Sequence, residues 1–179
     1  MPTIHIDEQV MAELKQRAID KTPNDVIRQL LDLTQPEAQS PQPGVYLIPH
    51  SPKEFYDVDA LKKWLSGELS KNGKYSVASS HYWANVIPDS ICLFHKNKTI
   101  VGEGKMIGRL MVYIGNEVSP DTGIRYAGEV HFEPASINVY AKPIPFKEVE
   151  KLLGKKLTFR GIQKLTQKDY AIIHKAYPI

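Results

Sequence analysis

The sequence has a single cysteine, Cys92, so no disulfide can form within the chain, which favours a reducing compartment such as the cytosol. It lacks the roughly 18-residue apolar run of a membrane span and a charged-then-apolar leader, so we expect neither a membrane segment nor a secretory signal. The six histidines show no metal-ligand spacing. Nucleophile-elbow, Walker and dinucleotide motifs are missing. We therefore expect a cytoplasmic protein without metal or other cofactor.

Acidic and basic residues are distributed unevenly along the chain. The net charge is +3, yet residues 1–34 carry four basic and six acidic side chains, so the positive excess lies in the remainder. Residues 35–43 contain three prolines and no apolar periodicity, which predicts an extended, solvated linker. The chain is thus expected to comprise a small module at 1–34, a linker at 35–43 and a larger domain at 44–179.

Residues 1–34 predict one short strand followed by two helices. Ile4 and Ile6 alternate with polar residues over 2–7, as a strand requires, and Thr22 followed by proline resembles a helix start. A segment this short cannot enclose a core, and its lone strand needs a partner strand. We therefore expect two chains to pair through this module. The residues predicted to form the dimer contact are Ile4, Ile6, Val26 and Leu30.

The run Thr3-Ile-His-Ile-Asp7, followed by Thr22-Pro-Asn-Asp-Val-Ile-Arg-Gln-Leu-Leu31, resembles the ribbon-helix-helix family, and in particular its SeqA N-terminal type. In that family the residues at the positions of Thr3 and His5 read bases in the major groove. Here the module is acidic, which opposes contact with a polyanion. We favour dimerisation alone, and DNA reading by this module stays an alternative.

Residues 44–179 predict a strand-rich domain with peripheral helices. Strands are expected at 45–48, 75–86, 90–95, 99–106, 108–115, 125–133 and 136–141, with a hairpin tip at Asn97-Lys98. Helices are expected after Ser51-Pro-Lys-Glu54, which has capping-box spacing, through Asn72-Gly73, then over 147–153, and from Thr166 through Ala176. The predicted class is α+β, with a small mixed β-barrel.

The run Tyr82-Trp83, with residues 87–106 after it, resembles the core of the PUA-like superfamily, which includes EVE, YTH and ASCH domains. Members show a polar turn, an apolar strand, a tip and a strand with a Val-Gly pair, as in Val101-Gly102 here. The resemblance implies a curved barrel that binds nucleic acid, often with one base, frequently a modified one, in an aromatic pocket. Stacking and edge hydrogen bonds hold such a base.

The segment 79–85 concentrates aromatic and polar side chains, and it is the predicted base pocket. On a strand its members would divide between two faces, so all of them line one cavity only if the chain bends. In the alternative interpretation, one of the two aromatic rings belongs to the core. The pocket residues predicted are Ser80, His81, Tyr82, Trp83 and Asn85.

Residues 151–175 carry seven basic side chains and only one acidic side chain, Asp169. Several of the basic residues alternate with glycine, which lets a phosphate approach the backbone. This pattern predicts phosphate contacts, and the residues we expect to make them are Lys155, Lys156, Arg160 and Lys164.

A nuclease is the enzymatic alternative, because Pro88-Asp89 followed by Glu103-Gly-Lys105 satisfies the written PD-(D/E)xK pattern. In such enzymes two carboxylates hold a divalent metal and the lysine positions the attacking water. The flanking Gly102 and Gly104 are equally explained by close packing inside a barrel.

Together these patterns predict a dimeric, non-enzymatic nucleic-acid-binding protein that acts in regulation or defence. DNA is favoured over RNA because the N-terminal module resembles that of DNA regulators. In a dimer, once one barrel has bound nucleic acid, the second barrel is held at a high effective concentration near the same molecule. The alternatives are the nuclease of Asp89, Glu103 and Lys105, and a ribbon-helix-helix regulator whose second domain senses a small ligand.

Overall fold

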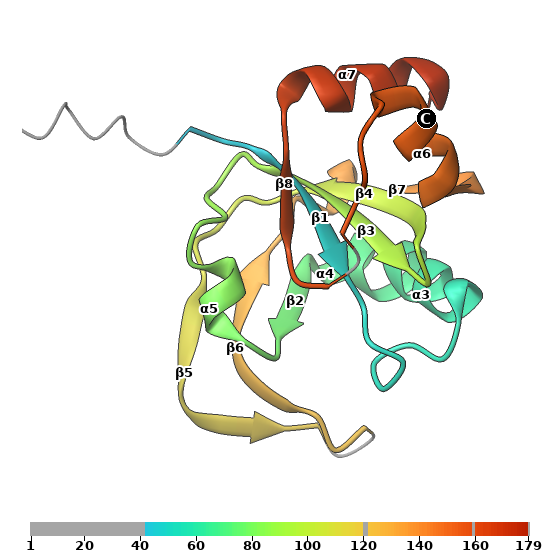
Figure 1. Cartoon of the computed structure of the whole chain (residues 1–179). Helices are drawn as coiled ribbons and strands as arrows, with labels where there is room; N and C mark the ends of the chain where they lie inside the picture. The colour runs from blue at the N-terminus through green and yellow to red at the C-terminus, as the bar shows by residue number, and fades with distance from the viewer. Residues whose placement is uncertain (1–41, 120–121, 159, 179) are drawn as a thin grey trace, which may run out of the picture. The chain divides into compact units, whose positions relative to one another are not determined.

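The computed structural model describes residues 42–119, 122–158 and 160–178 (Figure 1). The chain divides into two units, Met1–Ser40 and Pro41–Ile179, and all of the described residues belong to the second. The predicted ribbon-helix-helix module, with Ile4, Ile6, Val26 and Leu30, lies outside the described residues. The same holds for most of the predicted linker.

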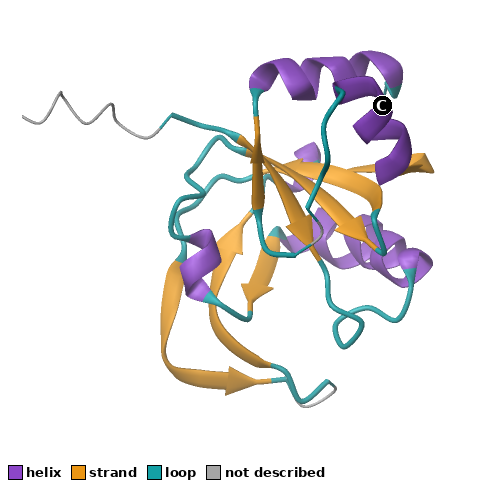
Figure 2. Cartoon of the chain, viewed as in Figure 1, coloured by secondary structure: helices purple, strands orange, loops and turns teal. Residues whose placement is uncertain are grey.

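Eight strands form two sheets in the described part of the chain (Figure 2). The five-stranded sheet has the order β7-β4-β3-β1-β8, and the three-stranded sheet has the order β2-β6-β5. Their bounds are β1 Val45–Pro49, β2 Lys74–Val77, β3 Ile91–Lys96, β4 Thr99–Lys105, β5 Met111–Val118, β6 Arg125–His131, β7 Asn138–Pro145 and β8 Gln163–Leu165.

All described strand pairs are antiparallel except β1 with β3, which run in parallel with Val45 opposite Ile91 and Pro49 opposite His95. A bridge between Met106 and Phe132 joins the end of β4 to the end of β6. The strands thus form two linked sheets, a mixed α+β core dominated by sheet, as the predicted class requires.

Helical segments border both sheets. Their bounds are α3 Val58–Trp64, the π-helical η1 Leu65–Leu69, α4 Ser70–Asn72, α5 Ser80–Trp83, the 3-10 helix η2 Pro134–Ser136, α6 Phe146–Leu153 and α7 Gln167–Ala176. Figure 1 shows α6 and α7 together at one end of the domain. Helices α3 and α4 lie toward the other end, near the carboxyl ends of β1 and β3.

The five-stranded sheet is buried on both faces. In β1, Val45 and Leu47 pack into a core formed with α6 and α7, whereas Tyr46 and Ile48 pack into a second core with α3, η1 and the three-stranded sheet. The continuous apolar run of β1 follows from this, because a strand covered on both faces has no solvated side.

Several predicted boundaries are confirmed. The tip residues Asn97 and Lys98 both have positive φ, as a two-residue hairpin turn requires. Gly73 and Gly154 end their helices in the left-handed region. Thr166 accepts a hydrogen bond from the Asp169 N–H, and the two residues form a complete capping box.

Other predicted elements are wrong, or are present with different bounds. The strand expected at 75–86 ends at Val77 and is followed by α5, and the strand expected at 108–115 occupies Met111–Val118. Ser51 and Glu54 do exchange capping-box hydrogen bonds, but the helix begins at Val58, because the Asp57 carboxylate caps it by accepting from the Ala60 N–H. Strand β8 was not predicted.

Close packing explains the two glycines of β4. An added Cβ at Gly102 would lie 2.5 Å from the Asn138 carbonyl oxygen, and at Gly104 it would lie 2.4 Å from Cδ1 of Ile137. The first obstacle is backbone and the second is the end of a flexible side chain. Gly67, in η1, has open space around its Cβ position.

We therefore predict that Gly102→Ala destabilises the fold by about 1–3 kcal/mol through overpacking, and Gly104→Ala by less, because Ile137 can change rotamer. The control Gly67→Ala should be neutral or stabilising by up to ~1 kcal/mol, since alanine favours a helix over glycine. Thermal unfolding of the three variants checks the order. Equal losses at Gly102 and Gly67 would contradict it.

Candidate functional site

A cavity of about 670 Å³ opens where the parallel strands β1 and β3 end. Because these strands run in the same direction, the residues that follow both of them meet at one edge of the sheet: His50 and Ser51 after β1, and Asn97 and Lys98 after β3. The edge beyond the carboxyl ends of parallel strands is a common place for ligand sites. Strand β2, helix α5 and the Gly161-Ile162 segment complete the walls.

Three aromatic rings line this cavity, and they differ in exposure. Tyr75 and Trp83 are buried, with ring centroids 5.2 Å apart, and Trp83 also meets Phe132 edge-on. Tyr82 is 56% exposed at the cavity rim. A Cβ added at Gly161 would lie 3.5 Å from the Tyr82 ring, so α5 and the segment before β8 meet there. Tyr82 is thus the most exposed of the three rings.

A buried hydrogen-bonded chain supports the cavity floor. The backbone N–H of His50 donates to the His95 carbonyl at 3.1 Å, and His50 Nδ1 lies 3.2 Å from the same oxygen. The Tyr75 hydroxyl lies 3.1 Å from His50 Nε2. Burial lowers the pKa of His50 to about 3 and raises the pKa of Tyr75 well above its ordinary value, with the Glu54 charge raising it further. Both groups are therefore neutral near pH 7.

The His95 ring is buried against Phe146 at the start of α6, with the two ring centroids 4.8 Å apart. Neither ring nitrogen has a hydrogen-bond partner among the described residues, and burial lowers the pKa of His95 to about 4. The imidazole is thus held neutral in an apolar setting. Unpaired buried nitrogens cost stability, because water can no longer solvate them.

The five residues of the predicted base pocket separate in the structure. Tyr82 and Trp83 line the cavity, whereas Ser80, His81 and Asn85 do not. The segment forms the short helix α5, so strand alternation does not apply there. The Asn85 carbonyl instead accepts a hydrogen bond from the Tyr46 hydroxyl at 2.9 Å. As the alternative interpretation held, Trp83 belongs to the core, although its edge reaches the cavity.

Sequence reasoning missed the polar lining contributed by other segments. The residues concerned are His50, Ser51, Glu54, Tyr75 and Ser76. Only the alternation of Tyr75 and Val77 along β2 was a local signal for any of them. Residues near 50 reach the cavity through the long-range pairing of β1 with β3.

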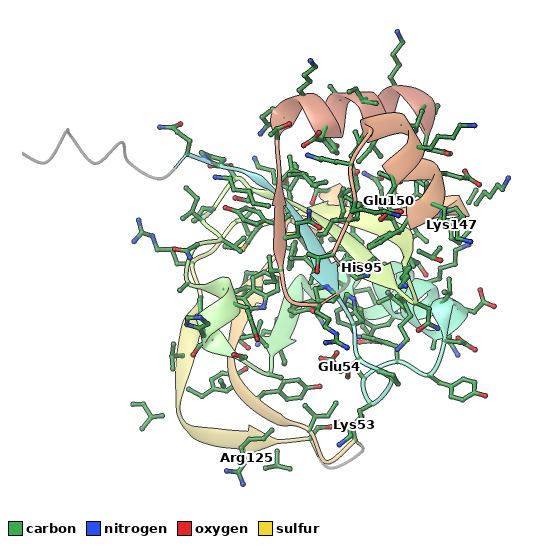
Figure 3. All side chains as sticks on the ribbon, viewed as in Figure 1. Lys53, Glu54, His95, Arg125, Lys147 and Glu150 are labelled. Atoms are coloured by element: carbon green, nitrogen blue, oxygen red, sulfur yellow. The ribbon has the colours of Figure 1, made fainter. Side chains whose placement is uncertain are left out.

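The predicted phosphate contacts do not form one cluster. Lys155 and Lys156 line a separate, shallow hollow at the end of α6, together with Lys147 and Glu150. Figure 3 shows Lys147 and Glu150 far from Glu54, which lines the cavity. The Lys155 ammonium pairs with the Asp169 carboxylate at 2.5 Å, so it also has a structural role. Farther along the chain, Gly161 forms part of the cavity wall.

Arg160 therefore lies one residue from the cavity wall, and Lys164 lies on β8 opposite Tyr46. The Lys164 ammonium is 5.9 Å from the centroid of the Tyr46 ring. Both side chains are exposed. Of the four predicted basic residues, Arg160 and Lys164 thus lie close to segments that line the cavity, whereas Lys155 and Lys156 lie at the end of α6.

The residues of the nuclease pattern do not assemble as that pattern requires. The two oxygens of the buried Glu103 carboxylate each accept a hydrogen bond, from Tyr140 at 2.8 Å and from Tyr170 at 2.9 Å. Asp89 pairs with Lys105 at 2.8 Å. No group of three His, Cys, Asp or Glu side chains placed to hold a metal is found among the described residues. Glu103 instead ties β4 to β7 and α7.

No helix within the described ranges is long and apolar enough to cross a membrane.

No family model matches the chain, and no curated protein matches its sequence. Solved structures do match its fold. A hypothetical protein from Leishmania major is 14% identical, with a TM-score of 0.50, over 76% of this chain and 95% of that one. Protein Atu2648 from Agrobacterium tumefaciens is 11% identical, also with a TM-score of 0.50, over 76% and 94%.

A variant ASCH protein from Zymomonas mobilis is 13% identical with a TM-score of 0.49, over 76% of this chain and 98% of that one. At these identities the likeness concerns the fold.

The buried His95 predicts a measurable dependence of stability on pH. Its pKa is about 4 in the fold, against an ordinary value of 6.5, so the unfolded chain binds the proton more readily. Its neutral form stabilises the fold fully above pH 6.5, and this contribution is lost as the pH falls toward 4. Between pH 8 and pH 5, we expect the His95→Phe variant to lose about 2 kcal/mol less unfolding free energy than the original chain does.

Urea unfolding at both pH values measures this difference. His81→Phe, which makes the same substitution at an exposed ring, provides a control for the substitution itself. An identical loss of stability in the His95→Phe variant and the original chain would show that this ring does not contribute.

Proposed function

We propose that the described domain binds nucleic acid and takes one base, in an extruded or single-stranded nucleotide, into the cavity beside Tyr82. The observation that carries the proposal is an aromatic-lined cavity whose rim holds a half-exposed tyrosine ring and whose wall carries serine hydroxyls. Its volume lies within the range of about 300–1,000 Å³ that is usual for small-molecule sites.

The cavity offers both kinds of contact that hold an extruded base. The open face of Tyr82 allows stacking, which is tolerant of base identity because every base has a π-face. Ser76 and Ser79 line the same cavity and can each donate or accept at a base edge. A modified base fits this arrangement, since the remaining apolar wall, which includes Val77 and Ala78, can accept an added methyl group.

Basic side chains support a polyanionic ligand over a free small molecule. Lys98 lines the cavity, Arg160 adjoins its wall, and Lys164 lies on the neighbouring β8. Cations placed around a base pocket can hold the phosphates that flank the bound nucleotide. In the alternative function, in which this domain senses a small ligand, the ligand would occupy the same cavity. Its affinity would then depend only weakly on salt concentration.

The remaining parts of the proposal rest on the sequence. We propose a homodimer formed through residues 1–34, DNA as the preferred nucleic acid, and a role in regulation or defence. A binding role is preferred to catalysis because tyrosine hydroxyls already occupy both oxygens of Glu103, which the nuclease pattern would require as a metal ligand.

Tyr82→Ala tests the stacking contact. We expect single-stranded DNA binding to weaken by about 1–3 kcal/mol, because the exposed ring face is lost while the fold is retained. Tyr82→Phe should bind nearly as well as the original chain. The control Tyr56→Ala removes a ring that is 88% exposed and outside the cavity, and it should have no effect. Equal affinity of the Tyr82→Ala and Tyr56→Ala variants would contradict stacking at this site.

Lys164→Ala tests the phosphate contacts. If Lys164 neutralises one phosphate, affinity should fall for every sequence, and the slope of log affinity against log salt should decrease by roughly 0.7–0.9. Lys155→Ala should mainly lower the melting temperature, because it breaks the pair with Asp169. Fluorescence anisotropy at several salt concentrations measures the slope, and an unchanged slope for Lys164→Ala would exclude this contact.

A further inference from the structure

The hydrogen-bonding direction of the cavity floor can be assigned from its backbone contact. A carbonyl oxygen only accepts, so the 3.2 Å contact between His50 Nδ1 and the His95 carbonyl places the imidazole proton on Nδ1. The other nitrogen, Nε2, then carries a lone pair and accepts from the Tyr75 hydroxyl at 3.1 Å. The single proton of that hydroxyl is therefore committed, and the Tyr75 oxygen can only accept from a ligand.

Glu54 contributes a second acceptor at the same cavity. It is the only acidic residue among the described residues that line it, and it is partly buried. Its Oε2 accepts from the Ser51 N–H at 2.9 Å, and the Glu54 N–H in turn donates to the Ser51 hydroxyl at 3.2 Å. Within the described part of the chain, Oε1 accepts no hydrogen bond, which leaves it available to a ligand.

The position of Glu54 suits a role at the cavity wall. It follows the turn after β1, and Figure 3 shows it beyond the end of that strand. The Glu54 charge contributes to the raised pKa of Tyr75, so the carboxylate acts electrostatically on the floor hydroxyl. An ionised carboxylate accepts hydrogen bonds and cannot donate them.

We propose that this cavity selects bases that carry an exocyclic amino group on their hydrogen-bonding edge, with Glu54 as the residue that determines this specificity. The inference rests on the proposed function and adds the class of base to it. An amino group donates to the carboxylate, as cytosine N4 does to an acidic side chain. A carbonyl at the same place, as in uracil or thymine, faces a negative charge without a proton between them and is rejected.

The serine hydroxyls do not alter this preference, because they rotate to donate or to accept. Ser76 and Ser79 can therefore satisfy the rest of the base edge for either class of base. The discrimination comes from the groups whose direction is fixed, which are the Glu54 carboxylate and the Tyr75 oxygen.

The experiment uses the full chain and short single-stranded DNA in which one central nucleotide carries a base and its neighbours are abasic. Two matched pairs of central base are compared, cytosine with uracil and 5-methylcytosine with thymine. Within each pair the shape is conserved, and an amino group with its acceptor ring nitrogen is exchanged for a carbonyl with a ring N–H. We expect the amino member of each pair to bind at least about fivefold more tightly.

Glu54→Gln is the informative variant. The glutamine carbonyl can still accept from the Ser51 N–H, so the turn is retained, and its amide N–H₂ then replaces the free carboxylate oxygen with a donor. The preference for amino bases should fall to near unity or reverse, while the affinity for the better base stays measurable. The control Glu68→Gln removes the same charge from an exposed glutamate outside this cavity and should keep the original preference.

The outcomes separate the two proposals. Equal binding of both members of each pair by the original chain would overturn the selectivity while leaving base binding intact. An unchanged preference in Glu54→Gln would overturn the role of Glu54. Failure of all four oligonucleotides to bind better than a fully abasic strand would overturn base binding in this cavity, and the inference with it.

Discussion

One backbone oxygen, the carbonyl of His95, organises the end of the domain where the cavity lies. It accepts two hydrogen bonds from His50, one from the backbone N–H and one from the ring. The first extends the β1–β3 pairing by one residue beyond Pro49. The second fixes the imidazole ring, whose Nε2 then accepts a hydrogen bond from the Tyr75 hydroxyl and links β2 to the residue that follows β1. The loss of either bond would leave a buried polar group without a partner, at a cost of about 1–3 kcal/mol.

The parallel direction of β1 and β3 explains why the cavity forms at this edge. Antiparallel neighbours would send the segments after the two strands to opposite edges of the sheet. Here the turn at 50–54 and the tip at 97–98 lie at the same edge, and α5 and Gly161 close the sides. Because both faces of the sheet are buried by the two cores, an open edge is the place where a ligand can reach polar groups of the interior.

Local signals in the sequence predicted the elements whose formation depends on neighbouring residues. The Asn97-Lys98 tip, the Thr166 cap and the glycine at position 73 are of this kind, and each lies where it was expected. Helix α5 was mistaken for a strand, because four residues are too few to distinguish the two periods. Strand β8 has only three residues and depends on pairing with β1, far away in the sequence.

The candidate site shows the same division. Tyr82 and Trp83, two of the five residues that a local concentration of aromatic and polar side chains predicted for a base pocket, both line the cavity. His50, Glu54 and Tyr75 were missed because their roles depend on contacts between distant parts of the chain. The bond between Tyr75 and His50 spans 25 residues, and that between His50 and His95 spans 45. The residue spacing within a single segment cannot predict hydrogen bonds between segments that lie this far apart in the sequence.

The central claim is that a base enters the cavity beside α5, and the two tryptophans of the chain provide direct probes of it. Trp83 lines the cavity, whereas Trp64 lies outside its lining, on α3. In a titration of the full chain with single-stranded DNA followed by NMR, we predict a saturable shift of the Trp83 indole N–H signal that is larger than the shift of the Trp64 signal. A Trp83 signal that stays unchanged while the DNA binds would contradict the account.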